Sequence, residues 1–168
     1  MDWSQIASDF EADGSLRDIY ILDTSLEDWA SVWAILTAAS GSLLFNVDGE
    51  SCSPPVDVGE AFALRLNHSV AASYTLGRQR LNCHFFTEEE VEFDFDPRQV
   101  DGPQEAEHLE QFLSELGRAT LKEVRLTLEN APDAIIARYE PSRGQVVWIP
   151  AAANVKAMSP SQASSAGL

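Results

Sequence analysis

The sequence predicts one α+β domain, in which a mostly antiparallel sheet of six to eight strands carries two or three helices packed on one face. Apolar residues recur at helical spacing in two segments, several short segments are β-rich, and those after residue 70 are joined by short turns. The chain has 168 residues. This length suits a single domain over 16–150, after a partly ordered acidic leader (1–15) and before a disordered polar tail (151–168).

The first strand leads directly into the first long helix. The segment DIYILDT (18–24) holds an unbroken apolar run and predicts a buried strand. The next segment, TSLEDW (24–29), offers two alternative capping boxes, one begun by Thr24 and one by Ser25. The helix that follows should end near Gly41. It has one apolar face, made by Leu26, Trp29, Val32, Trp33 and Leu36.

The rest of the chain predicts short strands, one short helix and one long helix. Pro54 and Pro55 indicate a loop over 51–57, and Asp57 caps the short helix that follows it. The long helix starts at Pro103, and its apolar stripe consists of Leu109, Phe112, Leu113 and Leu116. The remaining strands are predicted over 42–47, 71–76, 79–86, 90–96, 123–129, 134–140 and 145–150.

The charge balance restricts the class of partner. The chain carries 27 acidic and 11 basic residues, for a net charge of −16. Such a field disfavours nucleic acids and anionic membranes, and it favours cationic proteins and metal ions. Acidic residues dominate 1–60 and 86–117, whereas 61–85 and 118–168 are mildly basic. A fold that gathers both acidic blocks on one side would polarise the surface.

Cysteine usage and the N-terminus both favour a cytoplasmic protein. Cys52 and Cys83 lie far apart without a CxxC motif. The sequence leaves one disulfide open, but two reduced thiols are the expected state. The N-terminus lacks the basic region and apolar core of a signal peptide. No apolar run approaches the roughly 18 residues that cross a bilayer.

The segment TEEEVEFDFDP (87–97) is the strongest functional signal, because it contains six carboxylates and no basic residue. Side chains alternate between the two faces of a strand. The apolar residues Val91, Phe93 and Phe95 therefore belong to the core. The carboxylates on the other side are expected to be exposed, because burying closely spaced like charges is unfavourable. This acidic row consists of Glu90, Glu92, Asp94 and Asp96.

Four roles are open to the acidic row: a solvated outer strand, a cation site, a pair of catalytic carboxylates, or a docking surface for a basic protein. An EF-hand loop is excluded, because Arg98 and Gln99 occupy a ligand position and the glycine position. An improvised cation site would include Asp101. Catalytic carboxylates need a pKa raised by an apolar pocket, which a wet acidic face does not provide.

Other motifs for catalysis or ligand binding are missing from the sequence. The histidines His68, His84 and His108 show no HxH or HExxH spacing, and no GxSxG, GxxxxGK[ST] or GxGxxG occurs. Arg78 and Arg80 are placed to grip one anion, although we expect them to pair with the acidic row across the sheet. We expect no metal and no cofactor.

Three segments, IYILDTSLEDW, CHFFTEEEVEFDFDP and FLSELGRA, resemble a group of small acidic bacterial proteins of the immunity-protein type, which belong to toxin–immunity systems. The resemblance covers residues 16–150. It implies a non-enzymatic protein that binds a cognate toxin, often a basic nuclease, and blocks its active site. It further implies that the acidic row mimics phosphates or fills a cationic cleft. Interfaces vary within this type, so no family binding residue is transferred.

The leading hypothesis is therefore a non-enzymatic, cytoplasmic binding protein that neutralises a basic partner protein, with a bacterial toxin as the candidate. Aromatic anchors beside the acids would supply the binding energy, and the candidates are Trp3, Tyr20, Tyr139 and Trp148. The expected contact residues are Glu88, Glu90, Glu92, Asp94 and Asp96.

Two alternatives belong to other functional classes. One is a metal- or small-molecule-dependent enzyme with an unrecognised site. A pocket that gathers Asp18, Asp23, His84 or the acidic row would favour the enzyme. The other is a structural subunit of a larger complex, which a large exposed apolar patch would indicate.

Overall fold

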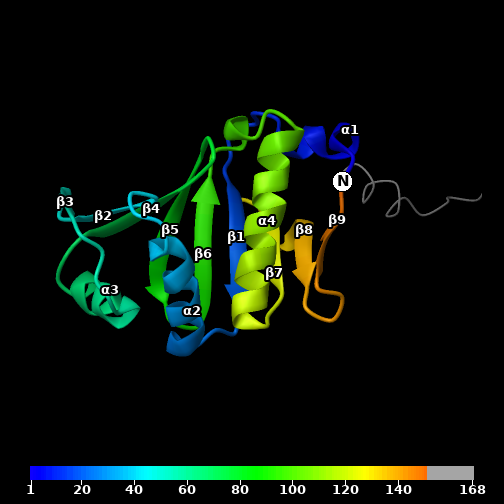
Figure 1. Ribbon diagram of the computed structural model, residues 1–168. Coiled ribbons are helices and arrows are strands. Elements are labelled where there is room, and N and C mark those ends of the chain that lie inside the picture. The colour runs from blue at the N-terminus through cyan, green and yellow to red at the C-terminus, as the bar shows by residue number, and fades with distance from the viewer. Residues whose placement is uncertain (151–168) are drawn as a thin grey trace, which may run out of the picture.

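The computed structural model describes residues 1–150 and shows an α+β fold built on one nine-stranded sheet (Figure 1). Every neighbouring pair of strands is antiparallel, in the order β3-β2-β4-β5-β6-β1-β7-β8-β9. The strands are β1 (Arg17–Leu22), β2 (Leu43–Val47), β3 (Glu50–Cys52), β4 (Val70–Leu76), β5 (Gln79–Thr87), β6 (Glu90–Phe95), β7 (Val124–Leu128), β8 (Ala131–Glu140) and β9 (Gln145–Trp148). The helices are α1 (Trp3–Ile6), α2 (Leu26–Thr37), α3 (Val58–Arg65) and α4 (Pro103–Thr120), with short 3-10 turns η1 (Ala7–Phe10) and η2 (Pro97–Gln99).

The α+β class is confirmed, but the predicted numbers of strands and helices are too low. The additional strand is β3, which begins just before the segment where the prolines predict a loop. All three residues of β3 are exposed, so no apolar alternation marks it in the sequence. Asp48 and Gly49 both adopt positive φ, as tight hairpin turns require, and they join β3 to β2. The helix outside the prediction is α1, a single turn in the leader.

Helices α2 and α4 pack against one face of the sheet (Figure 1). Of the two capping boxes that the sequence offers, the one between Ser25 and Asp28 forms at the start of α2. The predicted apolar stripes are buried, except for Leu26, which is exposed. The side chains that fill the space between helices and sheet include Trp29, Val32, Trp33, Leu36, Leu109, Phe112, Leu113, Leu116, Ile19, Ile21, Val91, Phe93 and Phe95.

The acidic leader is attached to this core at one end of the sheet. Ile6 and Phe10 are buried, and the Phe10 ring meets the Trp148 ring edge-on at 6.3 Å. Arg17 is buried at the start of β1, where its Nε donates to the Asp9 carbonyl oxygen at 2.7 Å and Nη2 pairs with Asp13 at 3.1 Å. The predicted disordered tail lies outside the described residues. No helix within 1–150 has the length and apolarity needed to cross a membrane.

Helix α4 approaches β8 so closely that only a glycine fits at position 117. A Cβ added to Gly117 would stand 2.0 Å from Cδ1 of Tyr139, which is itself buried. Neither the helical backbone nor a ring packed against the sheet has room to move away. The contact therefore fixes the distance between α4 and the C-terminal half of the sheet.

Replacing Gly117 with alanine should destabilise the protein by about 1–3 kcal/mol through overpacking, despite the roughly 1 kcal/mol by which alanine favours a helix. Urea denaturation of the full chain measures this difference. Gly59 in α3 is the control, because its added Cβ meets only side-chain atoms, at 3.2 Å or more. If G117A were as stable as G59A, the close packing of α4 on Tyr139 would be wrong.

Candidate functional site

Three central strands place polar side chains on the sheet face opposite α2 and α4. In the strand register, Asp94 of β6 lies between Asp18 of β1 and Asn82 of β5, and Glu92 lies between Tyr20 and His84. Strand pairing thus brings together residues that are far apart in the sequence, since directly opposed side chains lie about 5 Å apart. We call this set the polar cluster; it comprises Asp18, Tyr20, Asn82, His84, Glu92 and Asp94.

An ion pair between His84 and Asp94 lies at the β5 side of the polar cluster. His84 Nε2 donates to Asp94 Oδ2 at 2.5 Å, and Asn82 Nδ2 donates to Asp94 Oδ1 at 2.7 Å. Burial disfavours the charged Asp94, but these two hydrogen bonds outweigh it and hold the pKa of Asp94 below its usual value. The same hydrogen bond to Asp94 raises the pKa of His84, against the opposing effect of burial.

Asp18 occupies the β1 side of the polar cluster and is only 2% exposed. Its Oδ2 accepts from the Tyr20 hydroxyl at 2.9 Å and from the Asn130 backbone N–H at 2.7 Å. The β7–β8 turn that carries Asn130 therefore closes over this carboxylate. Burial raises the pKa of Asp18 despite both hydrogen bonds, and burial also raises the pKa of Tyr20 and of Glu92.

The polar cluster brings together Asp18, His84 and two members of the acidic row, Glu92 and Asp94, which are groups that an enzyme would require. Asp23 stands apart, exposed in the turn after β1. Asp18 Oδ2 already accepts two hydrogen bonds, and Asp94 is paired with His84. Among residues 1–150, no group of three His, Cys, Asp or Glu side chains is arranged to hold a metal ion.

The four residues of the predicted acidic row differ in position and in hydrogen-bond partners. Glu90, Glu92 and Asp94 share the face opposite the helices, as their alternation predicts, but all three are half-buried and not exposed as expected. Asp96 lies beyond the end of β6, where it caps η2 by accepting from the Arg98 N–H and forms an ion pair with the Arg98 guanidinium. Asp94 and Asp96 are therefore neutralised within the protein, whereas the carboxylates of Glu90 and Glu92 have no hydrogen bond or ion pair to another described residue.

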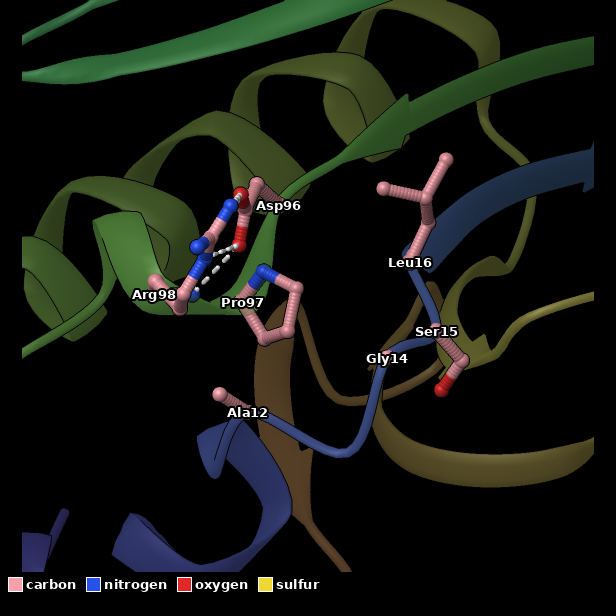
Figure 2. A pocket seen from close by; sticks show the side chains of 7 residues that line it. All are labelled: Ala12, Gly14, Ser15, Leu16, Asp96, Pro97 and Arg98. Carbon is pink, nitrogen blue, oxygen red and sulfur yellow. Dashed lines mark hydrogen bonds and ion pairs between the residues drawn. The ribbon is translucent and has the colours of Figure 1, made fainter.

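Asp96 and Arg98 line a small pocket of about 260 Å³ against the loop that leads into β1 (Figure 2). Figure 2 shows the Arg98 guanidinium folded back onto Asp96 on one side and Gly14 and Ser15 on the other. The positive charge of Arg98 and the negative charge of Asp96 neutralise each other at this pocket. The pair therefore stabilises the turn after β6 and does not present a charge to a ligand.

Arg78 and Arg80 do not pair with the acidic row. Arg78 forms ion pairs with Asp101 and with Glu105 at the start of α4. Arg80 is exposed, and its side chain has no ion pair within the described residues. The prediction of cross-strand pairing is therefore wrong, because Arg78 precedes β5 in the tight turn at Gly77 and points toward α4.

Carboxylates gather at the β5–β6 hairpin, and a backbone contact holds this hairpin in place. The Thr24 N–H donates to the Glu89 carbonyl at 2.9 Å, and Thr24 Oγ1 donates to the Glu88 carbonyl at 2.7 Å. The hairpin is thereby fixed to the turn between β1 and α2. None of the four carboxylates here has a hydrogen bond or ion pair with the rest of the described chain. We call this surface the acidic end: Asp23, Glu88, Glu89 and Glu90.

An apolar groove of about 480 Å³ borders the acidic end. Phe86 is 54% exposed and Leu66 is 82% exposed. Both line this groove together with Glu88, and its remaining walls come from Gly59, Phe62, Ala63, Arg65 and Thr87. An exposed phenylalanine and leucine beside unpaired carboxylates offer the apolar anchor that a docking surface needs.

Strand β4 pairs with β5 only as far as Cys83. The carbonyl oxygens of the β5 residues that follow are therefore free to accept hydrogen bonds from Arg65, which lines the groove. Beyond that point, Arg65 Nη1 donates to the carbonyl oxygens of Phe85 and Phe86, at 2.5 and 2.9 Å. Its guanidinium also lies 5.3 Å from the centre of the Phe86 ring, which stacks on His84 at 4.9 Å. The exposed ring is thus held between a cation and the polar cluster.

The aromatic anchors that the sequence suggests are located elsewhere. Tyr20 and Tyr139 are buried, Trp148 is partly buried with its indole N–H donating to Glu110, and Trp3 stacks on Phe10. The sequence could have indicated Phe86 as an aromatic anchor, because it alternates with the core residue Phe85 along the strand and so points away from the core.

Comparisons with protein-family models, curated proteins and solved structures return no match for this chain.

The imidazole of His84 should titrate above the ordinary histidine value of 6.5. Its ion pair with Asp94 stabilises the fold fully below 6.5, and this contribution is lost as the pH rises through the folded pKa. Imidazole NMR resonances followed from about pH 5 to pH 9 would measure the pKa. Asp94→Asn should lower it. A wild-type value at or below 6.5 would rule out the pair in solution.

Proposed function

We propose that this protein binds a cationic protein partner through the acidic end and the adjoining apolar groove. The observation that carries the proposal is the contact of these two surfaces at Glu88, which belongs to both. Unpaired carboxylates attract a basic partner over a long range and accelerate association. The exposed Phe86 and Leu66 then provide apolar area that slows dissociation.

The surrounding charges favour the same partner. The whole chain carries a net charge of −16, and the four carboxylates of the acidic end form no ion pair within residues 1–150. By contrast, Asp94 and Asp96 are paired with His84 and Arg98. We therefore place Glu88 and Glu90 at the centre of the interface, Glu92 beside them, and Asp94 and Asp96 outside it.

The partner class that best fits this surface is a basic toxin, which the protein would neutralise without catalysing a reaction. The resemblance to immunity proteins supports this part of the proposal, as does a surface that offers both charge and apolar area. A cytoplasmic location belongs to the same proposal. The partner would present lysine or arginine side chains around an apolar residue that enters the groove.

An acid–base enzyme is the second candidate, since the polar cluster joins His84 and Asp94 with two carboxyl groups of raised pKa, Asp18 and Glu92. The binding function is preferred because the hydrogen bonds to Tyr20 and Asn130 keep Asp18 covered. If Asp18 has a catalytic role, Asp18→Asn should reduce turnover of a substrate. The same substitution should leave partner binding unchanged.

The test begins with affinity capture of the tagged chain from its own cells at low and high salt, with mass spectrometry of the retained proteins. We expect one stoichiometric basic protein that is released as the salt concentration rises. With that protein purified, charge reversal in E88K/E89K should slow association by about ten-fold or more at low salt. Phe86→Ala should mainly accelerate dissociation.

The matched control is E107K/E115K, which changes the net charge equally on the exposed side of α4. It should slow association far less than the hairpin variant does. Equal effects of the two variants would show that net charge alone, and not the acidic end, attracts the partner. Capture of no basic protein at any salt concentration would contradict the proposed function itself.

A further inference from the structure

A second groove runs along β4, on the same face of the sheet as the polar cluster. The side chains of β4 on this face are small, and Ala71 and Ser73 form the floor. Longer side chains from β2 and β5 stand on either side, because Ser73 pairs with both Leu44 and Asn82. The resulting pocket measures about 390 Å³ and is lined by Asn46, Val70, Ala71, Ala72, Ser73, Arg80, Asn82, Cys83 and His84.

The floor of this β4 groove contains an unsatisfied polar atom. Ser73 Oγ is buried and has no hydrogen-bond partner within the described residues. A buried hydroxyl without a partner costs about 1–3 kcal/mol. Ser73 lies on the groove side of β4, opposite the core residue Ala72. A ligand in the groove would meet this hydroxyl once the Ser73 side chain turns about χ1, and the bond to the ligand would then satisfy it.

The wall of the β4 groove contains an uncompensated cation. Six other arginines, Arg17, Arg78, Arg98, Arg125, Arg138 and Arg143, form ion pairs with carboxylates. Arg65 donates to two backbone carbonyls. Within residues 1–150, the guanidinium of Arg80 has neither kind of partner, although this is a strongly acidic protein. Its five N–H donors remain available to a planar or tetrahedral oxyanion.

Most of the remaining polar groups are compatible with a negatively charged ligand; the unpaired carboxylate beside them is Glu92, which lies opposite His84 on β6. The nearby carboxylate of Asp94 is paired with His84 and accepts from Asn82, so it does not repel an anion as an unpaired carboxylate would. Protonated His84 uses Nε2 for Asp94 and keeps a second N–H at Nδ1. Asn46 adds an amide on the opposite wall. Donors thus predominate in a pocket of the size that small ligands occupy.

We propose that the β4 groove binds the oxyanion group of a small molecule, a carboxylate or a phosphate, with Arg80 and Ser73 as its principal donors. The site lies on β2, β4 and β5, separate from the acidic end, and it does not depend on the cationic protein partner.

The experiment titrates the full chain with inorganic phosphate and, separately, with succinate, at constant ionic strength set by sodium chloride. Amide resonances in a ¹H–¹⁵N correlation spectrum report where each anion binds. We expect saturable shifts over 71–73 and 80–84 at concentrations up to about 10 mM, the range of a weak single-anion contact. Shifts with phosphate alone assign a phosphoryl ligand, shifts with succinate alone assign a carboxylate, and shifts with both support a general oxyanion site.

Arg80→Ala should weaken this binding by about ten-fold or more, and Ser73→Ala by several-fold, because each removes a donor to a charged group. The matched control is Arg118→Ala. Arg118 is an exposed arginine on α4 that likewise has no ion pair within the described residues. This variant should bind as the wild type does. Equal weakening by R80A and R118A, or shifts scattered over the surface, would overturn the site.

Discussion

The register between β1 and β6 is the constraint on which the rest of the structure depends. It sets Ile19 beside Phe93 under the helices, and it sets Tyr20 beside Glu92 on the opposite face. A slip of one residue would exchange the two faces, so that carboxylates would enter the core and aromatic rings would meet water. Both halves of the sheet grow outward from this pair, with β5 next to β6 and β7 next to β1.

The same register explains why the acidic residues of one strand have unlike environments. The position of each carboxylate along β6 decides which neighbour it meets: His84 and Asn82 at Asp94, Tyr20 at Glu92, and the hairpin turn at Glu90. Charge is therefore compensated toward the end of β6 and uncompensated at its start. The unpaired charge at the start of β6 thus lies beside an exposed apolar groove.

Local patterns were sufficient to predict the core of the sheet and the long helices, because burial there follows from alternation and from helical spacing. Phe93 and Leu113 are examples, since both were placed in the core from the residues next to them. Strand β3 was missed because its exposed residues carry no pattern. The burial of Tyr20 has no local signal, because its hydroxyl donates to Asp18, a carboxylate that also accepts from Asn130, over a hundred residues away. The groove at Phe86 depends on Arg65 of a separate helix, which no local pattern reveals.

Strand β3 also bears on how the protein behaves at high concentration. An open sheet of nine strands has two edges, and a long unpaired edge is a template for pairing with further chains. In the described part of the chain, one edge is β3, only three residues long and carrying Glu50, and the other is the four-residue β9, followed by Pro150. Short edges with a charge and a proline resist the addition of another strand. The large sheet is therefore protected against aggregation by its ends.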